Sequence, residues 1–92
     1  MKIKVKFFAT FRELFDGEVK EIGLDNGSSI QDLVNLLCDS RQRRQKMFDR
    51  SGGLRPYIKI LKNGRHIEFL DGIRTELGDG DVVAMFPPVG GG

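Results

Sequence analysis

Hydrophobic and polar residues alternate strictly at the start of the chain, from Lys2 to Phe8. Ile3, Val5 and Phe7 share one parity, whereas the lysines and Phe8 occupy the other. Because successive side chains of a strand point to opposite faces, a period of two predicts a strand with one buried face. The chain is therefore expected to open on a strand that keeps Phe8 on its outer face.

The alternation is lost between Ala9 and Phe15, and a turn pair follows at Asp16-Gly17. Val19 to Leu24 then has the pattern of a second strand. We expect these two strands to form an opening hairpin.

A helical stripe begins after the loop at Asp25-Asn26-Gly27. Ser28 or Ser29 is a good N-cap, because a serine hydroxyl accepts a hydrogen bond from an orphan backbone N–H. Gln31 and Asp32 each lie three residues after one of these serines, which is a capping-box arrangement. The apolar residues that recur at i, i+3, i+4 and i+7 are Ile30, Leu33, Val34 and Leu37.

The second half of the chain predicts a hairpin and a last strand. Tyr57 to Lys62 and Arg65 to Leu70 flank Asn63-Gly64, a pair that favours a type I′ turn because both residues tolerate positive φ. Val82 to Phe86 is the last strand, and Pro87-Pro88 ends it because proline donates no ladder hydrogen bond. If Val83 and Met85 are core, Phe86 lies on the open face of the sheet.

The segment from Asp39 to Arg55 is basic and less regular, with a short second helix expected near Arg43 to Phe48. A basic run can contact an acidic partner or RNA. We interpret Arg41 to Arg55 instead as a solvated polar helix and loop, because Asp49 and Ser51 interrupt it and aromatic residues are few.

The order of elements is strand, strand, helix, strand, strand, strand. By composition, the first and last strands are the best suited to burial, so we expect them to form the central pair of the sheet. A helix across one face of such a sheet is the β-grasp plan. The fold class expected is α+β, with a mixed sheet of four to five strands and one main helix. Residues 1–86 would form this domain, and residues 87–92 would form a flexible tail.

Size and composition narrow the function. A chain of 92 residues is one domain with a modest core. A net charge of +2 is too small to argue for nucleic acid, and no apolar run resembles a signal or a membrane span. Cys38 is the single cysteine, which excludes an internal disulfide and fits a reducing compartment. These features predict a cytoplasmic protein.

The most informative motif is at the end of the sequence, in Asp79 to Gly92. It contains Phe86-Pro87-Pro88-Val89, then Gly90, then Gly91-Gly92. This ending resembles the C-terminal signature of the MoaD/ThiS family, the ubiquitin-like sulfur carriers. Two further segments, Phe7 to Leu14 and Asn63-Gly64-Arg65, look like that family's first strand with its loop and its mid-chain turn. The resemblance therefore spans nearly the whole chain.

The resemblance implies a carrier that is itself a substrate rather than an enzyme. The carboxylate of Gly92 would be adenylated and converted to a thiocarboxylate. Pro87, Pro88, Val89, Gly90 and Gly91 would thread into the partner's active site. No cofactor would be bound, because the activating partner uses the ATP.

The implied partners are a ubiquitin-activating-type adenylyltransferase (similar to MoeB or ThiF) and the large catalytic subunit of molybdopterin synthase. Sulfur would then pass to the pterin precursor of the molybdenum or tungsten cofactor. The longer middle of the chain also looks similar to archaeal ubiquitin-like modifiers, which would be joined through Gly92 to lysines of target proteins. A sulfur carrier for cysteine synthesis or tRNA thiolation stays open, as does an interaction or RNA-binding domain with an idle tail.

A docking face follows from strand parity. Phe8 and Phe86 would lie together on the open face beside the tail, where aromatic side chains dominate protein interfaces. In the strand predicted from Arg65 to Leu70, Ile67 and Phe69 would be core and His66 would be outside. His66 therefore joins Phe8 and Phe86 as a docking candidate.

The remaining candidate residues do not predict a nucleophilic cysteine, a zinc site or a catalytic carboxylate pair. Cys38 lies beside a helical apolar stripe and is interpreted as a small buried hydrophobe. One histidine and one cysteine do not make a zinc site, which needs about four ligands. Asp79 and Asp81 are interpreted as turn residues rather than as a catalytic pair.

Overall fold

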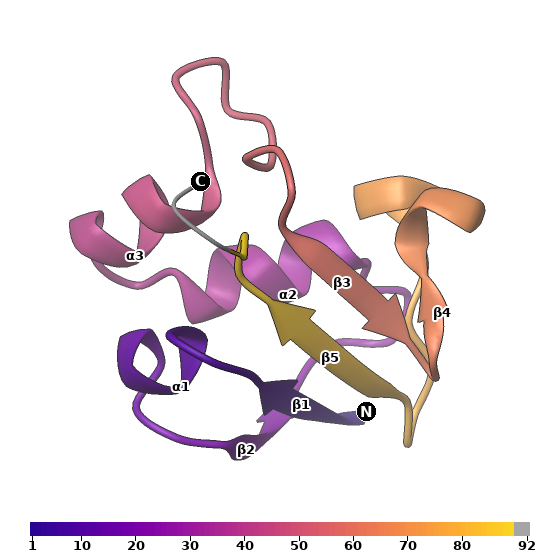
Figure 1. Cartoon of the computed structure of the whole chain (residues 1–92). Helices are drawn as coiled ribbons and strands as arrows, with labels where there is room; N and C mark the ends of the chain where they lie inside the picture. The colour runs from indigo at the N-terminus through magenta and orange to yellow at the C-terminus, as the bar shows by residue number, and fades with distance from the viewer. Residues whose placement is uncertain (90–92) are drawn as a thin grey trace.

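The computed structural model describes residues 1–89, which form a sheet with helices against it (Figure 1). The strands and helices are β1 (Lys2–Phe7), α1 (Phe11–Leu14), β2 (Val19–Gly23), α2 (Ile30–Leu37), α3 (Arg41–Met47), β3 (Lys59–Lys62), β4 (Arg65–His66) and β5 (Val82–Phe86). Two 3₁₀ helices, η1 (Ile67–Phe69) and η2 (Gly72–Arg74), lie between β4 and β5.

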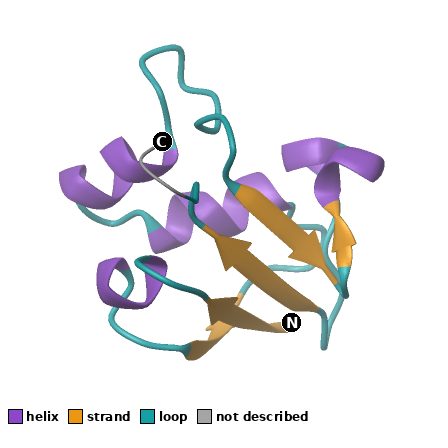
Figure 2. Ribbon diagram, viewed as in Figure 1, coloured by secondary structure: helices purple, strands orange, loops and turns teal. Residues whose placement is uncertain are grey.

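The sheet has five strands in the order β2-β1-β5-β3-β4. β1 and β5 pair in parallel at its centre, and the other neighbours are antiparallel. The main helix, α2, lies behind the sheet, and α1 and α3 lie beside the ends at which β1 and β5 finish (Figure 2). A mixed sheet with a helix on one face is the β-grasp arrangement, so the predicted fold class is confirmed.

Strand parity sets the core as the sequence predicts. Ile3, Val5 and Phe7 of β1 and Val83 and Met85 of β5 are all buried. The opening hairpin is also confirmed, with β1 and β2 antiparallel and Val5 opposite Lys20. The alternation therefore assigns each of these residues to the correct face.

The predicted cap and buried stripe of α2 are both present. Ser29 is the N-cap: its hydroxyl accepts from the backbone N–H of Asp32 at 3.3 Å, and the Asp32 carboxylate accepts from the Ser29 N–H at 2.9 Å. This reciprocal pair satisfies two backbone donors that the first turn leaves free. The four residues of the stripe, Ile30, Leu33, Val34 and Leu37, are buried.

Two of the helices differ from the sequence prediction. The segment between Ala9 and Phe15 contains the short helix α1, which buries Phe11 and stacks Phe15 on Phe7 at 4.7 Å between ring centroids. The second helix, predicted near Arg43 to Phe48, starts earlier at Arg41, because the Ser40 hydroxyl accepts from the backbone N–H of Arg43 at 3.2 Å.

The second hairpin is shorter than predicted. Asn63 and Gly64 have φ of 50° and 82°, as a type I′ turn requires, but β4 ends at His66 and η1 follows. The His66 ring nitrogen accepts from the Glu68 N–H at 3.1 Å and so caps η1. In a 3₁₀ helix, residues two apart do not share a face. Ile67 is therefore buried as predicted, but the prediction of a core Phe69 is wrong, because its side chain is 81% exposed.

The turn that leads into β5 is held by a carboxylate. Asp81 accepts from the Asn63 side-chain amide at 2.9 Å and from the Gly78 N–H at 2.7 Å, and lies 3.6 Å from the Lys62 ammonium. The Asn63 side-chain oxygen in turn accepts from the Val82 N–H at 2.9 Å. Burial by itself raises the pKa of Asp81, but these hydrogen bonds and Lys62 lower it overall, below its usual 3.8.

Within residues 1–89, no helix is both long and apolar enough to cross a membrane.

The first prediction concerns the buried face of α2. Leu33→Ala should lower the free energy of unfolding by about 2–5 kcal/mol, because it opens a cavity in a closely packed core. Leu36 is on the same helix but is 52% exposed, so Leu36→Ala should cost about 0.5 kcal/mol or less. Urea unfolding of both variants measures the difference, and equal losses would contradict the assignment of the faces.

The second prediction concerns Asp81. Asp81→Asn should destabilise the fold by about 1–2 kcal/mol at pH 7, because the amide can place a donor against the Gly78 N–H. The folded pKa of Asp81 lies below the unfolded value, so its contribution is present above that unfolded value. It is lost as the pH falls through the folded pKa.

Unfolding curves at several pH values test this. The stability gap between parent and Asp81→Asn should narrow below about pH 4. Asp25→Asn is the control, because the exposed Asp25 side chain makes no hydrogen bond or ion pair within residues 1–89. A gap that widens toward low pH would refute the role of the Asp81 carboxylate.

Candidate functional site

The parallel pairing of β1 with β5 builds the site around the end of β5. The register places Phe7 beside Met85, and the Phe8 N–H donates to the Met85 carbonyl at 3.1 Å. The next residues, Phe8 and Phe86, stack with ring centroids 4.3 Å apart and planes at 9°. The predicted pair is therefore present on the open face, where each residue is half-buried rather than fully exposed.

His66 is on the same face but not in the same place. It pairs with Leu61, and Leu61 pairs with Ala84, so His66 is two strands away from β5. Two strand spacings are roughly 10 Å. The His66 ring instead meets Phe69 edge-on at 6.2 Å between ring centroids. The structure therefore does not bring His66 to the Phe8–Phe86 pair.

An apolar groove of about 620 Å³ lies where the chain leaves the sheet, and we call it the tail-root groove. Its lining residues are Tyr57, Lys59, Leu61, Phe86, Pro87, Pro88 and Val89. Pro87 and Pro88 are half-buried in it, whereas Val89 is 88% exposed. Three of the predicted tail residues thus line a surface on which a partner side chain can be enclosed.

Three residues of this groove, Tyr57, Lys59 and Leu61, were not among the predicted docking or tail residues. Leu61 could have been found by parity, because Ile58 and Ile60 are buried and Leu61 must then face outward. Tyr57 shares the parity of Leu61 in the strand predicted from Tyr57 to Lys62, but the start of that strand is wrong, because β3 begins at Lys59 and Tyr57 lies in the loop before it. It is 82% exposed at a φ of 69°, a conformation that side-chain-bearing residues rarely adopt.

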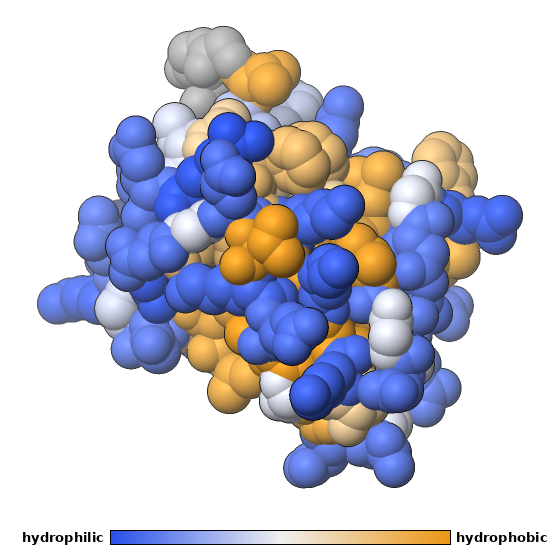
Figure 3. Space-filling model, turned by 90° about the horizontal axis from the view of Figure 1, so that it is seen from below, coloured by the Kyte–Doolittle hydropathy of each residue, from blue (hydrophilic) through white to orange (hydrophobic). Residues whose placement is uncertain are grey.

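The molecule seen from below presents mostly hydrophilic side chains, which break its hydrophobic areas into small patches (Figure 3). That face therefore offers no broad apolar surface to compete with the tail-root groove.

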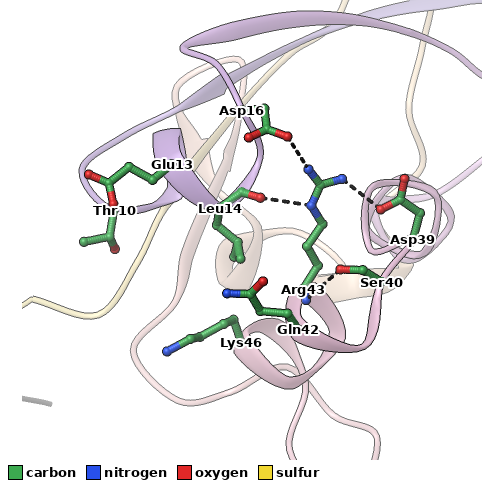
Figure 4. A pocket seen from close by; sticks show the side chains of 9 residues that line it. All are labelled: Thr10, Glu13, Leu14, Asp16, Asp39, Ser40, Gln42, Arg43 and Lys46. Carbon is green, nitrogen blue, oxygen red and sulfur yellow. Dashed lines mark hydrogen bonds and ion pairs between the residues drawn. The ribbon is translucent and has the colours of Figure 1, made fainter.

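A hollow of about 700 Å³ beside α1 and α3 is lined mainly by polar side chains (Figure 4). The Arg43 guanidinium lines it, donating to Asp39 at 2.8 Å, to Asp16 at 3.0 Å and to the Leu14 carbonyl at 2.9 Å. Its side chain is only 17% exposed and also lies over the Phe15 ring. Arg43 thus ties α3 to α1, and this hollow is interpreted as structural.

Cys38 and the acidic turn residues behave as the sequence predicts. Cys38 is buried, and burial raises the pKa of its thiol to about 11, so it is neutral at pH 7 and a poor nucleophile. Asp79 accepts from the Lys2 N–H at 2.8 Å and Asp81 holds the turn before β5, so both serve backbone structure. No group of three potential metal-ligating side chains occurs in residues 1–89.

Gly90, Gly91 and Gly92, including the carboxylate on which the predicted chemistry rests, lie outside the described residues. The structure therefore describes the C-terminal segment as far as Val89, together with the tail-root groove beside it.

Comparison with known proteins places this geometry in a family. Small archaeal modifier protein 3 of Haloferax volcanii is 36% identical over 92 residues, covering 100% of both chains. The molybdopterin synthase sulfur carrier subunit of Mycobacterium tuberculosis is 30% identical over 93 residues, covering 100% of this chain and 99% of its own. The crystal structure of SAMP1 from Haloferax volcanii matches with a TM-score of 0.85 at 25% identity over 100% of both chains.

The sequence pattern of the ThiS family matches residues 5–92, from the middle of β1 through the terminal glycines. The match thus includes the central strand pair, the tail root and the diglycine that the sequence singled out. The chain belongs to the ThiS family, the ubiquitin-like sulfur carriers and small modifiers.

Proposed function

We propose that this protein is a sulfur carrier whose Gly92 carboxylate is activated by an ATP-dependent adenylyltransferase of the ubiquitin-activating type. The carboxylate attacks the α-phosphate of ATP and releases pyrophosphate, and hydrosulfide (HS⁻) then displaces AMP to leave a thiocarboxylate. The chain acts as substrate and carrier in the cytoplasm, and catalysis belongs to its partners. The observation that carries the proposal is the departure of Phe86-Pro87-Pro88-Val89 from a central strand beside the tail-root groove.

The need for activation follows from the carboxylate. An α-carboxyl group has a pKa near ~3.3–3.7, so it is ionised at neutral pH and is a poor electrophile. Attachment of AMP supplies a leaving group. The activating enzyme must therefore hold the chain end within reach of ATP while the folded domain stays outside.

The tail composition suits threading into a narrow active site. Glycine has no Cβ, so residues 90–92 can pass a tight channel in any backbone conformation. Ordering such residues costs about 1–2 kcal/mol each, and the partner's contacts must offset it. Pro87 and Pro88 reduce that cost at the root, because each fixes φ near about −65°. Six extended residues from Pro87 reach roughly 20 Å.

For the fate of the sulfur, we propose transfer within molybdopterin synthase to the pterin precursor of the molybdenum or tungsten cofactor. The tail would enter the large catalytic subunit. The 30% identity to the Mycobacterium tuberculosis subunit over the whole chain supports this assignment. So does the Phe86-Pro87-Pro88-Val89 motif, all four residues of which line the tail-root groove.

The second candidate is a protein modifier joined through Gly92 to target lysines. The 36% identity to small archaeal modifier protein 3 over both full lengths favours it. Both functions begin with the same acyl-adenylate and differ in the nucleophile that receives it. A sulfur nucleophile gives the thiocarboxylate, whereas a lysine amine gives an isopeptide bond.

The activation step is tested by intact mass spectrometry. Incubation with a cognate activating enzyme, ATP and a sulfur donor should add about 16 Da, because sulfur replaces one carboxyl oxygen. Omission of ATP is the first control. A chain lacking Gly91-Gly92 should fold normally but gain no mass. Loading of this truncated chain, or no ATP-dependent change in the parent, would refute the assignment of Gly92.

Experiments in cell extract distinguish sulfur transfer from conjugation to target proteins. Sulfur transfer predicts that the large molybdopterin-synthase subunit copurifies with the carrier and forms molybdopterin from the loaded chain. Conjugates of high molecular weight that disappear on deletion of Gly91-Gly92 would assign the modifier function instead.

Docking is tested at Phe86. Phe86→Asp should weaken binding to the activating enzyme by about 30-fold, because it places a charge on the wall of the tail-root groove. Phe69→Asp is the matched control, since Phe69 is 81% exposed and lies outside that groove. Titration calorimetry on both folded variants measures the affinities. Equal affinities for the two variants would remove Phe86 from the docking surface.

A further inference from the structure

The charge of this chain is concentrated in one segment. Residues 41–55 contain six of the 15 basic residues and one of the 13 acidic residues, which gives the segment a net charge of +5. The whole chain carries only +2, so the remainder is net negative at −3. The small total charge therefore conceals a strongly basic region.

The fold separates these six cations into one that is used internally and five that face solvent. Arg43 is held by Asp16 and Asp39 as described above. The exposed cations are Arg41, Arg44, Lys46, Arg50 and Arg55. Within residues 1–89, Arg41 and Arg50 make no side-chain hydrogen bond or ion pair. Their charges are thus available to a partner.

Four of the exposed cations share a hollow of about 590 Å³ on the outer side of α3. It is lined by Arg41, Arg44, Gln45, Phe48, Asp49, Arg50, Gly52 and Arg55. Asp49 offsets one of the four positive charges. Its Oδ1 accepts from the Ser51 hydroxyl, the Ser51 N–H and the Gly53 N–H, so the carboxylate is held by its own loop.

This basic hollow continues to the root of the tail. Gln45 and Arg55 also line a neighbouring hollow of about 750 Å³, which Lys46, Tyr57 and Pro87-Pro88 complete on the other side. Among residues 1–89, no carboxylate lines this second hollow. A path of unbalanced positive charge thus runs from α3 to the prolines at which the tail begins.

We propose that these two hollows form a basic docking surface for an acidic segment of the protein that receives the tail. The proposal rests on the proposed function, because it requires a protein that binds the tail root. A partner bearing Asp and Glu side chains complements the surface, and charge attraction over a Debye length of about 10 Å would speed encounter and orient the tail.

The same surface is poorly suited to RNA. Single-stranded nucleic acid is bound by exposed aromatic side chains interleaved with cations. Phe48 is buried, and the Arg44 guanidinium lies over its ring at 5.2 Å. Tyr57 is the exposed aromatic residue of the two hollows. One stacking platform among five cations favours a carboxylate-bearing protein segment.

The first experiment compares two charge-matched double variants in the loading reaction. The double variant Arg41→Glu/Arg50→Glu should raise the KM of the activating enzyme for the carrier about tenfold at about 50 mM salt and leave kcat within about twofold. The difference in KM should disappear near about 500 mM salt, because salt screens the charges. Arg65→Glu with Arg74→Glu changes the net charge equally but lies outside both hollows, and its KM should change less than about twofold. Equal KM values for the two variants would overturn the docking surface.

The second experiment does not depend on loading. A fluorescein-labelled peptide of about twelve Glu, Asp and Gly residues should bind the parent and the Arg65/Arg74 variant alike, and bind the Arg41/Arg50 variant at least about fivefold more weakly. If the parent is not loaded but the peptide binding follows this order, the proposed function fails and the docking surface stands. Equal peptide binding by both variants, or tighter binding of a uridine oligonucleotide of the same length than of the peptide, would overturn the docking surface.

Discussion

The parallel pairing of β1 with β5 at the centre of the sheet determines where the C-terminal segment of the chain leaves the sheet. It buries Val5 beside Val83 and Phe7 beside Met85, so both strands are anchored in the core against α2. The same register stacks Phe8 on Phe86 on the opposite face, immediately before Pro87. The buried central strand β5 is thus followed within a few residues by Val89, which is 88% exposed.

The elements that the sequence predicts well are those with a simple period or a local cap. Alternation along β1 and β5 assigns every core residue correctly, and the Ser29–Asp32 capping box marks the start of α2. The pairing of Phe8 with Phe86 could also be predicted, because it needs only the parity of two strands and their adjacency. The family was evident from the last fourteen residues, which are read without knowledge of the fold.

What the sequence could not supply are features made by contacts between distant segments. Phe69 has the parity of a core residue, but the His66 cap turns the chain into η1 and exposes its ring. Arg43 is one of six similar cations, and only the meeting of α1 with α3 shows that it is internal. Tyr57 and Arg55 become neighbours of Pro87 through the return of a loop, so no pattern along the chain marks their place at the tail root.

The central claim is that the Gly92 carboxylate becomes an electrophile, and trapping with hydroxylamine tests it most directly. Hydroxylamine added during activation with ATP should convert that carboxylate to a hydroxamate, a gain of about 15 Da that tandem mass spectrometry places on the final glycine. A hydroxamate that is absent, or that is found on side-chain carboxylates such as Asp79 or Asp81, would contradict the account.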